Sequence, residues 1–503
     1  MARFGLLAAS AALLCSVHAQ TAASEFPSCD ILVSAGLSDI LYYPDDTEYQ
    51  ASITSYWSGT VQAVRPWCIV RPRSTAEVAA AFKALVAADA EGEWDIAVRG
   101  GGHSHWASNN VGNGTTIDLS LLNAVTYNNC TQVAKIGAGA RWGAVFAKVE
   151  SFGRTVTGGR EGNVGVAGLT LGGGASFHSA HRGFACDDIV NYEVVLADGS
   201  VVQANTRSYT DLFKALKGGG NNFGIVTRFD MATFEPPAQN LWGGLLFMMY
   251  DQKDAILRQL NRFIDINSEN RDDSETVTFT WTAGAPEPQI AMIALNMAGL
   301  QDSPSFTPLE NVTTLMDDRR SRTYGEMIRT YISAAGPRSV WYSTCFHNRL
   351  DILQKAASIF EAAVARLAAQ YGADSGVGLN IVVQPLGKHF AVPGAGRNVL
   401  GLDKTLTHDS VIWLVQSFSS TAEQEAVLVP IIAEMTAELE AYVESQNANT
   451  PWRYYNYVNQ DQHPLESYGA ENVRFLKAVA AKYDPAGVFQ TRVPGGFKLS
   501  HIQ

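Results

Sequence analysis

Three glycine-rich segments in the first half of the chain constrain its fold most strongly, because each must form a close backbone turn. They are RGGGHS at residues 99–104, VGVAGLTLGGG at 164–174 and GGGNNFGIVT at 218–227. Residues without a Cβ atom can turn their N–H groups towards an anion such as a pyrophosphate. One such segment is equally typical of a structural turn, but three in one region favour a single extended ligand held by the backbone.

The first glycine segment leads directly into a histidine. Residues 94–98 and 115–119 are expected to form strands on either side of it, so the segment joins ordered elements. His103 therefore follows a predicted anion-binding turn, which places an imidazole beside the ligand. A surface histidine after a tight turn remains the alternative for this segment taken alone.

Charge and composition limit the classes of molecule that this protein is expected to bind. The chain has 503 residues, 46% hydrophobic and 17% charged, which is typical of a globular protein large enough for two domains. Its net charge of -12 argues against nucleic acid or an anionic membrane as a partner. Small molecules or neutral polymers remain as possible partners, and we expect the protein to be a monomer.

The composition changes along the chain and indicates an α+β protein in three parts. Residues from about 61 to 236 alternate short strands and helices, with Ser74 as the cap of a helix and a hairpin at 191–200. Residues 237–449 begin with strands at 245–250 and 276–281 and continue with amphipathic helices such as 352–371. Residues 450–503 contain a tyrosine-rich segment, expected to be a strand, and a helix at 472–482.

The N-terminus has the pattern of a secretory signal peptide, residues 1–19. An apolar run follows Arg3, and Val17-His18-Ala19 places small residues where a signal peptidase cleaves. The alternative, a membrane anchor, is disfavoured because the run is shorter than the roughly 20 residues that span a bilayer. We expect a secreted protein, in which Asn113, Asn129 and Asn311 are glycosylation sequons.

The cysteines favour a disulfide over a metal site. Without Cys15 the chain keeps an odd number, so at least one thiol is unpaired, and we expect the disulfide to join Cys29 and Cys68. No CxxC pair occurs, and His103 with His105 lacks further ligands, so we expect no metal. His178 and His181 are interpreted as structural or surface residues.

With these segments in this order, the chain resembles the berberine-bridge-enzyme-like FAD-linked oxidases, a branch of the vanillyl-alcohol oxidase superfamily common as secreted proteins of fungi and plants. The segments that carry the resemblance are PWCIVRP (66–72), the three glycine segments, YYNY (454–457) and YDPAGVF (483–489). The resemblance implies a two-part PCMH-type FAD-binding domain over 20–236. It also implies a substrate domain over 237–449, built on an antiparallel sheet covered by helices, and a segment over 450–503 that returns to the FAD domain.

The resemblance also implies the cofactor and its contacts. In that family the histidine of the first glycine segment bonds through a ring nitrogen to the flavin 8α carbon, which assigns this role to His103. Many members form a second bond through a cysteine, but Glu161 occupies that position here, so we expect FAD to be bound covalently through His103 only. The other expected FAD-binding residues are Arg99, Gly100, Gly101, Gly102, Ser104, Gly162, Val164, Gly168, Gly173, Gly174, Ile225 and Asn456.

Tyrosines are the candidate catalytic bases. In an extended segment Tyr455 and Tyr457 would share one face, so both are predicted to orient the substrate and to take its proton. We expect neighbouring charges to lower the phenol pKa from about 10. Filling of a sheet core is the alternative. Gln416 is a third candidate because relatives place a catalytic or gating residue on that strand, although Trp413 could hold the place instead.

These observations predict an oxidase that takes a hydride from an alcohol, amine or activated C–H bond of a small molecule and reduces O2 to H2O2, in fungal secondary metabolism. Oxidation of the anomeric carbon of an oligosaccharide is an alternative that the missing second flavin bond disfavours. A flavin-bearing binding or surface protein with little turnover is a third possibility, disfavoured by the intact tyrosines. A serine hydrolase is excluded because no GxSxG segment is present.

Overall fold

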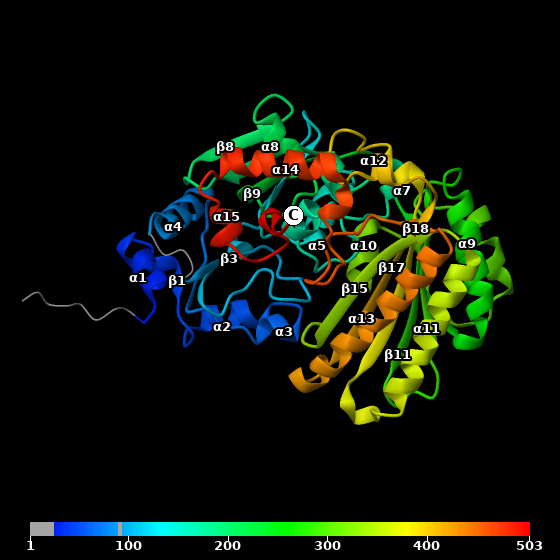
Figure 1. Ribbon diagram of the computed structural model, residues 1–503. Coiled ribbons are helices and arrows are strands. Elements are labelled where there is room, and N and C mark those ends of the chain that lie inside the picture. Colours follow the sequence, from blue (N-terminus) through cyan, green and yellow to red (C-terminus); the bar gives the residue numbers. More distant parts are fainter. Residues whose placement is uncertain (1–24, 89–92, 503) are drawn as a thin grey trace, which may run out of the picture.

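The computed structural model describes residues 25–88 and 93–502, so the predicted signal peptide lies outside the described residues. Three β-sheets with flanking helices make up the described chain, and Figure 1 shows the two smaller sheets on one side of the molecule and the largest on the other. This mixed helix and sheet architecture confirms the expected α+β fold class. No helix among the described residues is both long and apolar enough to cross a bilayer.

The first sheet carries the first glycine segment at the end of a strand. Its strands lie in the order β1 (Leu41–Tyr42), β2 (Cys68–Val70), β4 (Gly114–Asp118), β3 (Asp95–Arg99), with β2 and β3 parallel to β4. Its helices are α1 (Pro27–Ser34), α2 (Thr47–Thr54), α3 (Gly59–Gln62) and α4 (Thr75–Ala87). The predicted cap is present, because the Ser74 side chain accepts a hydrogen bond from the Glu77 N–H.

The second sheet is antiparallel and carries the predicted hairpin. Its strands lie in the order β5 (Val125–Asn128), β6 (Val133–Gly137), β9 (Ile225–Ala232), β7 (Ile189–Val195), β8 (Val201–Asn205). The associated helices are α5 (Trp142–Glu150), α6 (Val166–Leu171), α7 (Ser179–Arg182) and α8 (Thr210–Ala215). The second glycine segment contains α6, and the third ends in β9, so both lie beside this sheet.

The third sheet has nine strands and is antiparallel. Eight of them lie in the order β13 (Thr314–Asp317), β10 (Leu241–Met249), β12 (Gln289–Asn296), β11 (Asp273–Thr282), β16 (Gly378–Leu386), β17 (Ser410–Ser419), β15 (Arg338–His347), β18 (Asn449–Thr450), and β14 (Arg320–Arg322) pairs with β10. The helices of this part are α9 (Lys253–Ile266), α10 (Tyr324–Thr330), α11 (Leu350–Ala368), α12 (Leu402–Thr405) and α13 (Ala422–Ser445).

Helices cover only one face of this sheet. Figure 1 shows α11 and α13 lying along it, and alternate residues of β17, among them Val411, Trp413 and Val415, belong to the core beneath those helices. Because side chains alternate along a strand, Leu414, Gln416 and Phe418 face the opposite side. That second face is turned towards the two smaller sheets. Because helices do not cover it, its side chains can line a site.

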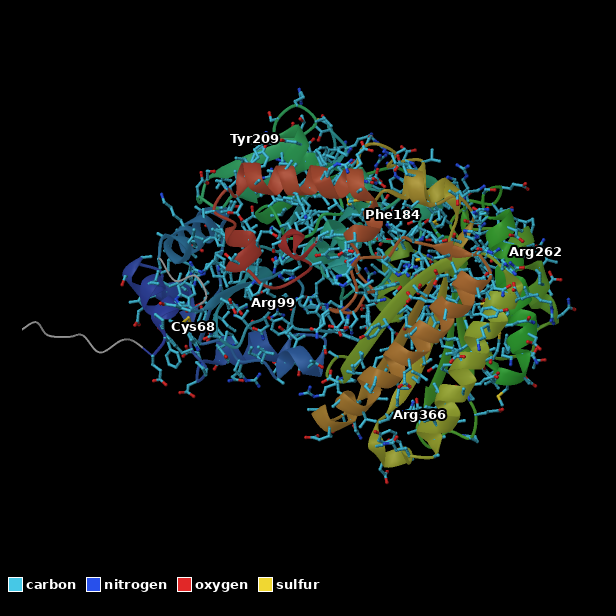
Figure 2. The ribbon with its side chains drawn as sticks, viewed as in Figure 1. Cys68, Arg99, Phe184, Tyr209, Arg262 and Arg366 are labelled. Carbon is cyan, nitrogen blue, oxygen red and sulfur yellow. A yellow bond between two sulfur atoms is a disulfide. The ribbon has the colours of Figure 1, made fainter. Side chains whose placement is uncertain are left out.

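The C-terminal segment returns to the two smaller sheets, as Figure 1 shows for α14 (Ala470–Tyr483) and α15 (Val488–Thr491). Phe489 of α15 stacks on Phe82 of α4 with ring centroids 5.0 Å apart. The carbonyl oxygen of Arg492 accepts a hydrogen bond from the Ile96 N–H of β3. The segment before α14 crosses the junction, where the Tyr454 and Trp452 rings pack against Phe184. Figure 2 labels Phe184.

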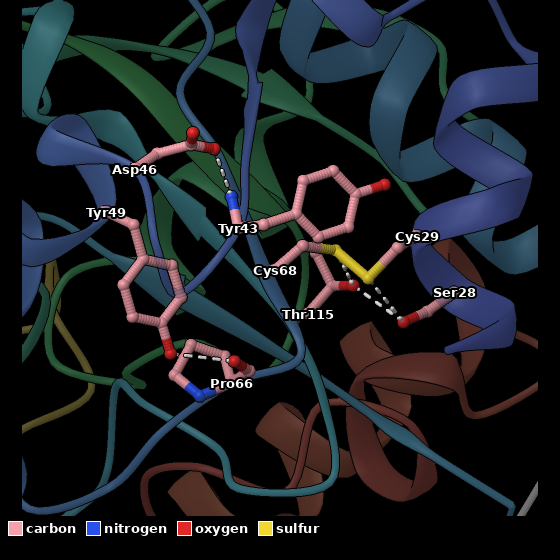
Figure 3. The surroundings of a disulfide bond; sticks show 8 residues. All are labelled: Ser28, Cys29, Tyr43, Asp46, Tyr49, Pro66, Cys68 and Thr115. Atoms are coloured by element: carbon pink, nitrogen blue, oxygen red, sulfur yellow. Dashed lines mark hydrogen bonds between the residues drawn. A yellow bond between two sulfur atoms is a disulfide. The ribbon is translucent and has the colours of Figure 1, made fainter. Parts of the chain in front are cut away.

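The disulfide Cys29–Cys68 is present and joins α1 to β2 (Figure 3). Both cysteines are fully buried, and the hydroxyls of Ser28 and Thr115 hydrogen-bond each other at 2.7 Å beside the bridge. Of the other described cysteines, Cys130 is exposed, and Cys186 and Cys345 are buried. The disulfide therefore ties the first helix of the described chain to the sheet that carries the first glycine segment.

Removal of the disulfide is expected to destabilise the protein. A Cys29→Ser, Cys68→Ser double variant opens a loop of 39 residues, which should lower the free energy of unfolding by about 4 kcal/mol through the greater entropy of the unfolded chain. Urea unfolding of the purified protein measures the difference, with Cys130→Ser as the matched control of unchanged stability. Equal stability of all three proteins would contradict the expectation.

Candidate active site

A cavity of about 520 Å³ lies between the glycine segments and the free face of the third sheet. One wall is mostly backbone and small side chains, from all three glycine segments. The opposite wall consists of side chains from β15, β16 and β17, and these are Trp341, Asn380, Val382, Leu414, Gln416 and Phe418. The three glycine segments therefore do meet at one site, as the sequence predicts for a single extended ligand.

The first and second glycine segments touch through their backbones. A Cβ atom on Gly101 would lie 2.4 Å from the Cα of Gly165, and one on Gly165 would lie 2.6 Å from the Cα of Gly101. Only glycine fits at both positions. This close approach holds the His103 loop against the segment that carries Glu161 and Val164.

A Gly101→Ala variant should lose this contact. The methyl group would overlap backbone atoms that cannot move away independently, so we expect the free energy of unfolding to fall by about 1–3 kcal/mol. Urea unfolding measures this loss of stability. The control is Gly112→Ala, where the nearest atom to an added Cβ is 4.0 Å away. The account of the loop contact would be wrong if both variants were as stable as the parent protein.

Arg99, which Figure 2 labels, is not among the residues that line the cavity. It is 1% exposed, and its guanidinium donates hydrogen bonds to the Ser52 carbonyl at 2.6 Å and to the Ser55 hydroxyl at 2.6 Å. An ion pair with Asp118 at 3.5 Å and the face of the Tyr56 ring complete its surroundings. Its position indicates that Arg99 supports the loop that carries His103 without lining the cavity.

The other predicted FAD-binding residues divide into two groups. Those that line the cavity are Gly100, Gly101, Gly102, His103, Ser104, Val164, Gly168, Ile225 and Asn456. Gly162, Gly173 and Gly174 do not line it: the Gly162 N–H bonds the Ile328 carbonyl, and the other two adopt positive φ at a turn next to Leu400 and Leu169. These three glycines shape the backbone around the site.

His103 is held on two sides. Its ring stacks on Trp57, with centroids 5.1 Å apart and planes at 19°. Its Nε2 atom lies 3.0 Å from Oε2 of Glu161, and the two side chains are only 13% and 18% exposed. The neighbouring His105 also lines the cavity, where it stacks on Trp341 and its Nε2 lies 3.2 Å from the Val458 carbonyl oxygen.

The tyrosine segment corrects the prediction of an extended strand. Residues 455–457 form a turn, closed by a hydrogen bond from the Tyr457 N–H to the Tyr454 carbonyl at 2.9 Å. The expectation that Tyr455 and Tyr457 share one face of a strand is therefore wrong, although both side chains line the cavity. The physical reason is the Asn456 amide, which donates to the Leu169 carbonyl at 3.0 Å and draws this segment onto α6.

The two tyrosines have different surroundings. The Tyr455 hydroxyl accepts a hydrogen bond from the Phe497 N–H, and burial raises the pKa of Tyr455 to about 12, so the predicted lowering is wrong for this phenol. The Tyr457 hydroxyl lies between Arg160, which donates to it at 2.7 Å, and Gln384, whose Oε1 lies 3.3 Å away. Only Tyr457 is directed towards the third sheet with a cationic partner on its oxygen.

Gln416 lines the cavity, and Trp413 does not, which settles the register that the sequence left open. Gln416 lies opposite Asn380 of β16 on one side and Trp341 of β15 on the other. An amide pair next to an indole ring therefore forms the centre of the sheet wall.

Sequence analysis missed several lining residues, namely Arg160, Trp57, Trp341, Asn380 and Phe418, and also Gln384, which bonds Tyr457. Arg160 had a signal, because it directly precedes Glu161. The others come from segments without a motif, and only the fold brings them together.

The structure also places the predicted glycosylation sequons and the two histidines that follow the second glycine segment. Asn113, Asn129 and Asn311 are exposed, so glycosylation at these sequons stays a prediction. His178 is buried and packs against Tyr324 and Phe234, whereas His181 pairs with Asp272 at 2.9 Å. In residues 25–88 and 93–502, no group of three His, Cys, Asp or Glu side chains is arranged to hold a metal ion.

Comparisons with known proteins agree on one family. A model described as "FAD binding domain" matches residues 66–205. A FAD-dependent monooxygenase of Fusarium proliferatum is 36% identical over 470 residues, which cover 88% of this chain and 87% of that protein.

Two solved structures show the same fold. Berberine bridge enzyme from Eschscholzia californica superposes with a TM-score of 0.72 at 16% identity, covering 94% of this chain and 99% of that one. Glucooligosaccharide oxidase from Acremonium strictum, which carries a 6-S-cysteinyl, 8α-N1-histidyl FAD, superposes with a TM-score of 0.73 at 22% identity, covering 93% and 99%.

Proposed function

This chain belongs to the PCMH-type FAD-dependent oxidoreductases of the vanillyl-alcohol oxidase superfamily, together with fungal FAD-dependent monooxygenases. From this membership and from the site, we propose that it is a covalently flavinylated oxidase of small-molecule secondary metabolites. It would take a hydride from an alcohol, amine or activated C–H bond and reduce O2 to H2O2. One observation carries the proposal: the glycine wall, His103 and the Arg160–Tyr457 pair line the same cavity.

The cavity fits FAD. Its glycine wall leaves backbone N–H groups free of side-chain cover, which suits a diphosphate. Apolar side chains beside it, among them Val98, Leu119, Ile225 and Phe489, suit flat aromatic rings. Gly100, Gly101, Gly102, Ser104, Val164, Gly168, Ile225 and Asn456 would hold the cofactor, and His103 would bond to it. When bound, FAD supplies the hydride acceptor and passes the electrons to dioxygen.

A single covalent bond through His103 is proposed because no cysteine of the described chain lines the cavity. Glu161 occupies the position of the second link, and a carboxylate cannot form a thioether. Among the described residues, Cys130 is exposed, Cys186 and Cys345 are buried elsewhere, and Cys29 and Cys68 are joined to each other.

Tyr457 is the proposed base. It would act as its phenolate, which the Arg160 guanidinium at 2.7 Å stabilises. The phenolate oxygen can take the substrate proton while hydride leaves the same substrate, and it becomes a neutral phenol. Trp341 meets the Tyr457 ring edge to face at 6.0 Å and fixes its orientation. Gln416 and Asn380 offer amide groups that can orient a substrate oxygen, so Gln416 is proposed as an orienting residue.

The wall opposite the glycines favours a largely apolar substrate. Trp57, Val382, Leu414 and Phe418 contribute hydrocarbon surface there, which suits a terpenoid, alkaloid or polyketide. Oxidation of an oligosaccharide is the second candidate, because an indole platform beside the Asn380 and Gln416 amides also suits a sugar ring.

We further propose that the protein is secreted as a monomer and glycosylated at Asn113, Asn129 and Asn311, with a leader over 1–19. The buried disulfide supports an oxidising compartment. We also propose the domain division at 236/237 and 449/450. The third sheet begins in sequence with β10, shortly after the first boundary, and its last strand, β18, ends one residue beyond the second.

Anaerobic bleaching tests the function. The yellow protein should lose its flavin absorbance when mixed with a polyketide-like or aromatic alcohol without air, and should recover it with H2O2 release when air is admitted. A parallel panel of oligosaccharides tests the second candidate. Failure to bleach with every compound of a broad panel would contradict turnover and favour a flavin-bearing binding protein.

A further inference from the structure

The structure assigns a role to Glu161 that goes beyond replacing a cysteine. We propose that Glu161 is the positioning residue and proton acceptor that directs bond formation to the Nδ1 atom of His103 during flavin attachment. This inference rests on the proposed function, in that His103 must be the tether.

The Glu161 carboxylate is fixed at both oxygens. Oε1 accepts a hydrogen bond from the Asn163 N–H at 3.0 Å, and Oε2 lies 3.0 Å from His103 Nε2. Both Oε2 and Nε2 are closed to solvent, and neither makes a hydrogen bond to any other group in the described chain. Their 3.0 Å contact is therefore an electrostatic one, without a hydrogen bond in this arrangement of the two side chains, and water does not compete for either atom.

The imidazole cannot easily turn its other nitrogen to Glu161. The Trp57 ring lies nearly parallel to it, and Trp57 is itself held by hydrogen bonds from its indole N–H to the Ser333 hydroxyl and from its backbone N–H to the Gly102 carbonyl. The Gly101–Gly165 contact fixes the distance between the loops that carry His103 and Glu161. The site thus defines which nitrogen faces the carboxylate.

This pairing selects the nucleophile. A neutral imidazole carries one proton, and the negative charge of a carboxylate 3.0 Å from Nε2 favours the proton on that nitrogen, which leaves the lone pair on Nδ1. Nδ1 forms the bond to the 8α carbon, and Glu161 receives the Nε2 proton as the ring becomes substituted. The 8α carbon loses one proton, and the electron pair released passes to dioxygen. In total, one N–H and one C–H bond are lost, one N–C bond forms, and O2 becomes H2O2.

Flavin incorporation into apoprotein tests the role. Apoprotein from riboflavin-limited cells is mixed with FAD, and aliquots are precipitated with acid so that only covalent flavin stays in the pellet. Glu161→Gln keeps a hydrogen-bond acceptor but not a base, and we expect incorporation to be about 10²-fold slower. Its rate should recover as the pH rises, because hydroxide can then remove the imidazole proton. Glu193→Gln, a carboxylate paired with Arg228 away from the cavity, is the control.

The attachment site gives a second readout. NMR of the flavin peptide from the parent protein should show the carbon on Nδ1, and Glu161→Met should give slower attachment with both nitrogens used. Attachment at Nε2 in the parent protein, or incorporation into Glu161→Met at the parental rate, would overturn the inference. Parent protein without covalent flavin would instead overturn the proposed function, so the two failures are distinct. Non-covalent FAD, released by acid, reports whether each variant folds.

Discussion

A Tyr457→Phe variant is expected to retain its full flavin content and to reduce that flavin about 10²–10⁴-fold more slowly than the parent protein. The substitution removes only the phenol oxygen, which as the phenolate would receive the substrate proton. Arg160 and Gln384 remain hydrogen-bonded to each other, and the ring keeps its place against Trp341. Anaerobic rapid mixing with a bleaching substrate measures the reduction rate directly, apart from reoxidation.

Tyr455→Phe is the matched control. Its hydroxyl accepts one backbone hydrogen bond, from the Phe497 N–H, and has no cationic partner, so its loss should slow reduction by less than about tenfold. Reduction of Tyr457→Phe flavin at the parental rate would assign the base to another group and would refute the role given to the Arg160 pair.

A His103→Ala variant is expected to lose all covalent flavin. The glycine wall is unchanged by this substitution, so FAD should still bind, but acid should release it into the supernatant, and the oxidase should be slower. The control is His105→Asn, two residues along the same loop. Burial lowers the pKa of His105 to about 4, and its Nε2 contacts the Val458 carbonyl. This variant should keep its covalent flavin, and covalent flavin in His103→Ala would contradict the assignment.

Local patterns predicted much of the fold. The Ser74 cap and the hairpin at 191–200 depend on neighbouring residues, and the structure contains both. The tyrosine segment shows the limit of such patterns. Its aromatic residues are typical of a strand, yet a contact from Asn456 to Leu169, distant in sequence, bends it into a turn. Tertiary contact of this kind overrides local preference and leaves no local signal.

The candidate site also has one part that the sequence predicts and one part that it does not. The glycine wall could be predicted because backbone approach demands glycine itself, as at Gly101 and Gly165. The substrate wall could not, because Trp57 and Trp341 belong to segments that meet only in the folded chain. The sequence identifies Glu161 as a departure from the family pattern, but its contact with His103 exists only in the folded chain.

The central claim is that this chain binds FAD through His103 alone. Mass spectrometry of proteolytic peptides from the acid-precipitated parent protein tests it most directly. The account predicts one peptide that carries the added mass of FAD, with fragmentation placing that mass on His103. Flavin in the supernatant, or attached to any other residue, would contradict it.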